Sequence, residues 1–135
     1  HTFCGSPVYC APEVVRASSS GYSGEKADVW ACGIVLYAML AGALPFHDND
    51  MDALVCMIQF DPAFYPDEFP PGAKTLVQKL LEKDPTKRLS VSEIELDPWV
   101  RGTDGGEGVV AVRREVSRNR MMQASASGRS VDGAA

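Results

Sequence analysis

The side chains that could bind a metal ion are too irregularly spaced to form a site. Cysteines stand at positions 4, 10, 32 and 56 and histidines at 1 and 47, so there is neither a Cys-x-x-Cys pair nor a ligand cluster. The acidic run DNDMD at 48–52 is spaced like a calcium-binding loop, but Ala53 replaces the glycine of its sixth position and Gln59 the glutamate of its twelfth. These acids fit a helix N-terminus better, and we predict no bound metal.

The cysteines are better explained as reduced thiols than as two disulfides. No stretch resembles a signal peptide, and Cys32 lies inside a strongly apolar run. We therefore expect an intracellular protein, located in the cytoplasm or the nucleus.

The charge distribution argues against a nucleic-acid partner. The chain has 135 residues and a net charge of −5, a length that fits one domain or a piece of one. Residues 1–100 hold 14 acidic against 7 basic side chains, whereas a nucleic-acid module needs a basic face. The arginines of 101–135 are too sparse to supply one.

One uncharged run is nearly long enough to cross a membrane. Val29–Phe46 contains 18 residues without a charge, but Asp28 abuts it and Gly42 and Pro45 end the helix early. No basic flank sets an orientation. A helix that is apolar on all sides is otherwise buried at the centre of a larger protein, so we predict a buried helix over Glu25–Ala41 and no membrane partner.

Four further helices are predicted from apolar residues at helical spacing and from capping signals. They cover Glu13–Ala17, Asp50–Gln59, Ala73–Lys83 and a short segment that begins at the capping box of Ser90 and Glu93. The linker at 60–72 carries four prolines and is predicted to be an ordered loop, and no strand pattern is present. Residues 101–135 lose periodicity and predict a disordered tail, with a short helix near Val109–Met122 as an option.

Several blocks together resemble the eukaryotic protein kinase family. The stretch CGSPVYCAPE resembles the end of the activation segment, which the A-P-E motif closes. ADVWACG resembles the start of the central helix F and LAGALPF its exit, while LLEKDPTKRLSVSEIELDPW resembles helices H and I with the D-P-x-x-R signature. The blocks follow the family order over 2–100. Their form is similar to the AMP-activated and calmodulin-dependent serine/threonine kinase group.

The resemblance implies a mainly α fragment of the protein-kinase-like α+β fold. Residues 1–100 would form part of its large helical lobe, and 101–135 the disordered, low-complexity tail. The Gly-rich loop, the V-A-I-K lysine, H-R-D and D-F-G are all absent, and in the family they precede A-P-E. The resemblance therefore implies that ATP and magnesium are cofactors of the intact parent, and that this chain binds neither and holds no catalytic residue.

Two functions remain open from the sequence. The first is a partial serine/threonine protein kinase, whose parent has protein substrates and an upstream activating kinase as partners and whose fragment is inactive alone. The alternative is a truncated, non-catalytic module that binds or competes through its substrate-side surface. In-frame H-R-D and D-F-G motifs upstream would favour the first, and an initiator methionine just before His1 the second.

Five residues match the family's substrate-side loop. By resemblance, Thr2 is the activation-loop phosphosite and Ser6 is the hydroxyl that supports the absent catalytic aspartate and lysine. Phe3, Pro7 and Cys10 resemble the walls of a pocket for the residue after the phosphoacceptor, which should then be apolar. An exposed threonine, a turn-forming serine and ordinary loop packing are the alternatives.

The remaining candidates are structural. The resemblance implies a buried ion pair between Glu13 of A-P-E and Arg88 of D-P-x-x-R, although either residue alone would be read as a surface charge. Asp28 matches a helix F acid that bonds the catalytic-loop backbone, and it needs a partner if it is buried. Trp30, Val35 and Met39 are predicted to lie in the core.

Overall fold

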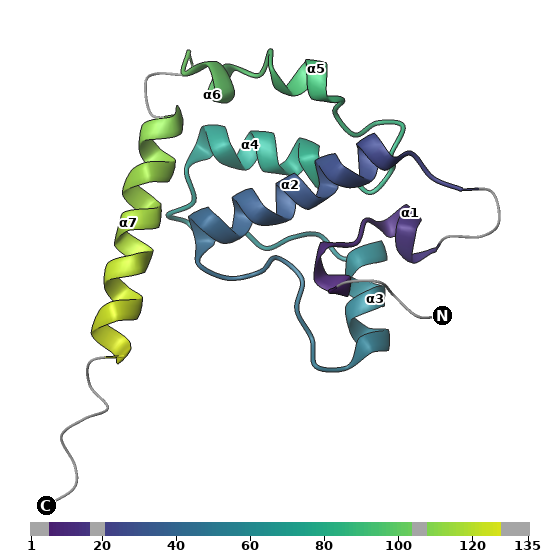
Figure 1. Cartoon of the computed structure of the whole chain (residues 1–135), viewed down its shortest axis with the longest axis horizontal. Coiled ribbons are helices and arrows are strands. Elements are labelled where there is room, and N and C mark those ends of the chain that lie inside the picture. Colours follow the sequence, from purple (N-terminus) through teal and green to yellow (C-terminus); the bar gives the residue numbers. More distant parts are fainter. Residues whose placement is uncertain (1–5, 17–20, 104–107, 128–135) are drawn as a thin grey trace, which may run out of the picture.

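The computed structural model describes residues 6–16, 21–103 and 108–127, and these form helices and no strand (Figure 1). The mainly α prediction is therefore confirmed. The elements are the 3-10 helix η1 (Pro7–Tyr9) and the α-helices α1 (Pro12–Val15), α2 (Gly24–Ala41), α3 (Met51–Phe60), α4 (Pro71–Leu80), α5 (Val91–Ile94), α6 (Pro98–Arg101) and α7 (Gly108–Ser127).

Helix α2 is the centre of the arrangement. Helix α4 packs along it, η1 and the far helix α7 also contact it, and α1 packs on α3 (Figure 1). The close approach of α2 to the end of α4 requires a glycine, because a Cβ on Gly33 would lie 2.8 Å from Leu81 Cδ2 and 2.9 Å from Leu80 Cβ. Any side chain at position 33 would push the two helices apart.

The ends of α2 lie within one residue of the prediction. Ser23 caps the first turn by accepting a hydrogen bond from the Lys26 N–H, and Gly42 ends the helix in the left-handed region at φ 72°. Within the described residues, no helix combines the length and the apolar character needed to span a membrane.

Other predicted caps are also present. Asp50 accepts a 2.8 Å hydrogen bond from the Ala53 N–H, so this acid of the DNDMD run does serve a helix N-terminus. Ser90 and Glu93 form the reciprocal capping box that opens α5. These signals were readable because both partners lie within three residues of each other.

The structure differs from the prediction in the ends of α1, α3 and α4, in one unpredicted helix and in the tail. Helix α4 covers Pro71–Leu80 and not Ala73–Lys83. Helix α6 was not predicted; it begins where Asp97 caps the N–H of Trp99. The tail expected to be disordered over 101–135 contains α7, which is longer than the optional helix at 109–122.

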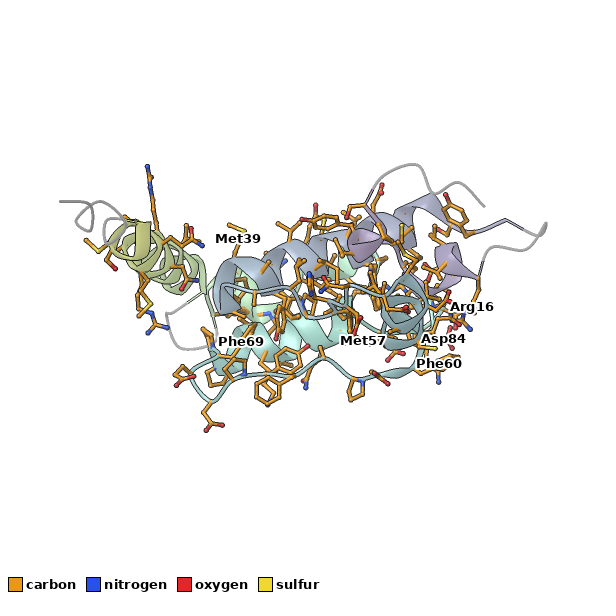
Figure 2. The ribbon with its side chains drawn as sticks, turned by 90° about the horizontal axis from the view of Figure 1, so that it is seen from below. Arg16, Met39, Met57, Phe60, Phe69 and Asp84 are labelled. Atoms are coloured by element: carbon orange, nitrogen blue, oxygen red, sulfur yellow. The ribbon has the colours of Figure 1, made fainter. Side chains whose placement is uncertain are left out.

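The core surrounds one side of α2. It is built from buried side chains of α2, α3, α4, α6 and the segments between them, among them Val29, Trp30, Ile34, Tyr37, Leu40, Phe46, Leu54, Ile58, Phe69, Leu76, Val77, Leu80, Leu81 and Trp99. Trp30 was correctly assigned to this core. The prediction that Val35 and Met39 lie in the core was wrong. They are 47% and 42% exposed, and Met39 projects away from the helix in Figure 2.

Three exposed residues of α2 form an apolar stripe. Cys32, Val35 and Met39 are three and four positions apart, so they lie on one face of the helix. Contiguous apolar surface of this kind drives association in water.

We predict that the chain self-associates through this stripe. Replacing Val35 and Met39 together with lysine should lower the sedimentation coefficient to that of a monomer and reduce the binding of an apolar-surface dye. The control is Leu96→Lys, which changes a 61% exposed leucine elsewhere and should change neither. A parent chain that is monomeric and binds no dye would contradict the prediction.

Candidate functional site

The predicted ion pair between Glu13 and Arg88 is present. Arg88 Nη1 lies 2.6 Å from Glu13 Oε1 and Nη2 lies 2.9 Å from Oε2, which is the two-bond geometry that a planar guanidinium makes with a carboxylate. The Arg88 side chain is fully buried and that of Glu13 is 13% exposed. The pair joins residues 75 positions apart, so it depends on the tertiary fold.

The other donors of Arg88 are also used. Nε donates to the Glu82 carbonyl at 2.8 Å, Nη1 to the Lys26 carbonyl at 2.7 Å and Nη2 to the Lys83 carbonyl at 3.4 Å. A guanidinium carries five N–H groups, and each has an acceptor here. The buried charge therefore has no unmet hydrogen bond, the condition under which such a group can be tolerated in a core.

These contacts connect three parts of the chain. Glu13 belongs to α1, Lys26 to the first turn of α2, and Glu82 and Lys83 to the segment after α4. The Lys26 ammonium in turn donates to the Arg88 carbonyl. Arg88 thus fixes the position of α1 relative to the central helix.

The electrostatics of Glu13 follow from the same contacts. Burial alone would raise the pKa of its carboxyl, but the hydrogen bonds from Arg88 and from the backbone, with the positive charges of Arg88 and Arg16, outweigh burial, and the pKa is lowered. Glu13 therefore stays ionised in the folded chain at neutral pH.

The substrate-side loop leads directly into this centre. Ser6 is exposed and precedes η1, while Pro7 and Cys10 are half-buried, and the Cys10 N–H donates to the Pro7 carbonyl at 3.0 Å. Burial raises the pKa of the Cys10 thiol. Thr2 and Phe3 lie outside the described residues. The roles assigned to these five residues remain predictions.

Asp28 does not meet the condition set for it. It is exposed on α2, so it needs no buried partner in this structure, and its role as a backbone acceptor stays a prediction. Among the residues that the structure describes, no three His, Cys, Asp or Glu side chains gather where they could hold a metal ion.

Lys83 is a residue of this centre that the sequence analysis missed. Its ammonium donates to the carbonyls of Met57 and Ile58 at the end of α3, at 3.2 and 2.6 Å. Burial lowers its pKa to about 8, with a smaller lowering from Arg88 that Asp61 and Glu82 oppose. A signal existed: the Ile58 carbonyl would bond the N–H of residue 62 in a longer helix, and residue 62 is a proline.

The comparison with known proteins agrees with this geometry. Residues 1–100 match the family described as protein kinase domain. The chain belongs to the protein kinase family. It is 46% identical over 104 residues to CBL-interacting protein kinase 10 of Oryza sativa subsp. japonica, covering 75% of this chain and 22% of that protein.

Two further relatives show the same relationship. The chain is 48% identical over 101 residues to CBL-interacting serine/threonine-protein kinase 16 of Arabidopsis thaliana, which covers 75% of this chain and 21% of the relative. It is 40% identical over 119 residues to CBL-interacting protein kinase 24 of Oryza sativa subsp. japonica, a match that covers 88% of this chain and 25% of that relative. The kinase resemblance drawn from the motifs is confirmed, and the chain spans between about a fifth and a quarter of the length of these relatives.

Removing Arg88 should be severely destabilising. Arg88→Ala would leave the largely buried Glu13 carboxylate without its partner, and we expect the free energy of unfolding to fall by about 3–5 kcal/mol. Arg88→Lys keeps the charge but loses the planar group that makes two parallel hydrogen bonds, so its free energy of unfolding should fall by an intermediate amount. Urea unfolding in the Val35→Lys, Met39→Lys background measures both, with the exposed Arg101→Ala as the control. A loss for Arg88→Ala no larger than that of the control would refute the role of the pair.

The pair should also make stability depend on acid. Since the pKa of Glu13 is lowered from 4.5 on folding, its contribution is present above that pH and is lost as the pH falls through the lower, folded value. Glu13→Gln should therefore be less stable at neutral pH and lose less stability than the parent between about pH 5 and 3. Asp84 and Glu93, whose pKa values are lowered by hydrogen bonds from Thr86 and Ser90, contribute to both chains equally. If the free energies of unfolding of the parent chain and of Glu13→Gln, measured with urea, change in parallel with pH, this expectation is contradicted.

Proposed function

We propose that this chain is the substrate-side part of a serine/threonine protein kinase whose parent transfers the γ-phosphate of ATP to protein hydroxyl groups. The observation that carries the proposal is the buried Arg88 guanidinium, whose five donors connect the A-P-E helix α1 to α2 and to the D-P-x-x-R segment. The family match over 1–100 and the relatives' names support it.

In this proposal the chain positions the substrate and other residues of the parent handle the nucleotide. No Gly-rich loop, H-R-D or D-F-G is found in the sequence, and these motifs hold ATP and magnesium in protein kinases. We therefore expect the chain alone to bind no ATP and to transfer no phosphate.

The substrate roles rest on the loop before α1. Pro7 and Cys10, together with Phe3, would form an apolar wall for the residue that follows the phosphoacceptor, and Ser6 would face the catalytic groups of the parent. Thr2 would be the site that an upstream kinase phosphorylates. The loop runs into α1 after Cys10, so the pair formed by Glu13 would hold its position, and phosphoryl transfer depends strongly on such positioning.

A chimera tests the proposal. Residues 1–100 would replace the matching segment of CBL-interacting protein kinase 10, and transfer of labelled phosphate from Mg-ATP to a serine peptide that the rice kinase phosphorylates would be measured. We expect the chimera to be active, its Arg88→Ala variant to lose most activity, and the 135-residue chain alone to show neither transfer nor saturable ATP binding in calorimetry.

Two results would contradict the proposal. A folded chimera without phosphoryl transfer would show that these residues do not serve a kinase. If the inactive chimera and the chain alone nevertheless bind the serine peptide equally well, the alternative of a non-catalytic binding module takes its place.

A further inference from the structure

The carboxyl end of α3 lacks a backbone donor that a continuing helix would supply. The Met57 carbonyl accepts from the Asp61 N–H at 3.0 Å, but the next carbonyl, of Ile58, would pair in a continuing helix with residue 62, a proline that has no N–H. Ile58 is fully buried. An unmet carbonyl beside a buried side chain is costly, so this helix end needs a donor from elsewhere.

Lys83 supplies that donor from the segment after α4. Its Nζ lies 2.6 Å from the Ile58 carbonyl oxygen and 3.2 Å from that of Met57. A positive charge at this end of a helix also interacts favourably with the helix dipole. Figure 2 shows the labelled Met57 and Asp84, the residue after Lys83, on the same side of the molecule.

The same ammonium lies against two core rings. Its Nζ is 4.1 Å from the centre of the Phe46 ring and 5.2 Å from that of Trp30, and the two rings stack at 6.0 Å. Such cation–ring contacts are attractive, more so where water is excluded. Lys83 therefore connects the end of α3 to the ring stack beside the central helix.

The charged groups around Lys83 do not replace these contacts. Asp61, Glu82 and Arg88 act on it electrostatically. Among the described residues, no carboxylate lies within ion-pair distance of its ammonium. Its strongest acceptors are the two backbone carbonyls, so its position is coupled to that of α3.

We propose that Lys83 is a positioning residue for the substrate-side loop, holding α3 in place so that α3 supports α1 and the loop before it. Helix α3 packs on α1, and α1 follows Cys10 and carries Glu13. The inference rests on the proposed kinase function for its effect on the reaction. It adds a second support for α1, which acts through α3 and not through the Glu13 carboxylate.

Lys83→Met in the chimera tests this role, because methionine has similar length and can fill the space without donating a hydrogen bond. We expect a severalfold rise in KM for the serine peptide, an unchanged KM for ATP, and faster hydrogen exchange in the last turn of α3. The matched control is Lys74→Met on α4, whose ammonium lies 5.5 Å from the Tyr65 ring and bonds no carbonyl of α3. Lys83→Arg keeps a cationic donor and should recover part of the peptide KM.

The outcomes separate this inference from the proposed function. Unchanged exchange in α3, or faster exchange with an unchanged peptide KM, would overturn the positioning role. If Lys83→Met does not fold, Lys83→Arg decides: a peptide KM above that of Lys74→Met together with faster exchange in the last turn of α3 supports the inference, and faster exchange without that rise in the peptide KM overturns it. An inactive unmodified chimera would refute the kinase function and, with it, the effect on the reaction, while α3 exchange in the 135-residue chain would still show whether Lys83 holds the helix.

Discussion

The burial of one guanidinium constrains the rest of this structure. An arginine stays charged at any accessible pH, so a buried one must find acceptors for all of its N–H groups. Arg88 takes one carboxylate from α1, one carbonyl from α2 and two carbonyls from the residues after α4. Each acceptor restricts where its segment can lie. Helix α4 ends at Leu80, before the predicted boundary, and beyond it the carbonyls of Glu82 and Lys83 accept from Arg88.

What could be predicted from the sequence divides along the range of the interactions. The caps at Ser23, Asp50 and Ser90 lie within three residues of their partners. The caps at Asp50 and Ser90 could be predicted from the sequence, and Ser23 agrees with the predicted start of its helix. The pair of Glu13 and Arg88 was reachable only through the motif resemblance. Pro62 indicates that the end of α3 needs another donor, but that Lys83 supplies it could not be predicted from local pattern, because its acceptors lie 25 and 26 residues away.

The error at Val35 and Met39 has a different cause. The sequence of α2 is apolar on all sides, and such a pattern predicts burial without saying which element covers each face. The described helices cover the faces that carry Trp30, Ile34 and Tyr37. The stripe that includes Val35 and Met39 stays exposed. The helix is apolar on this face too, as the sequence indicates, but the prediction that these residues are buried was wrong. Packing partners, and not helical propensity, decide that distinction.

The two cations near Trp30, Arg88 and Lys83, differ in whether they can lose their charge. Arg88 lies 5.2 Å from the Trp30 ring centre and Lys83 also 5.2 Å, so two positive groups share one aromatic neighbour. Only the lysine can release a proton in an accessible range, and its pKa is lowered to about 8, mainly by burial. The fixed charge therefore sits where the carboxylate of Glu13 neutralises it. The titratable one sits at a helix end, where a neutral amine could still donate to carbonyls. The contact that holds α1 therefore changes in acid, where Glu13 is protonated, whereas the contact that holds α3 loses its positive charge near pH 8.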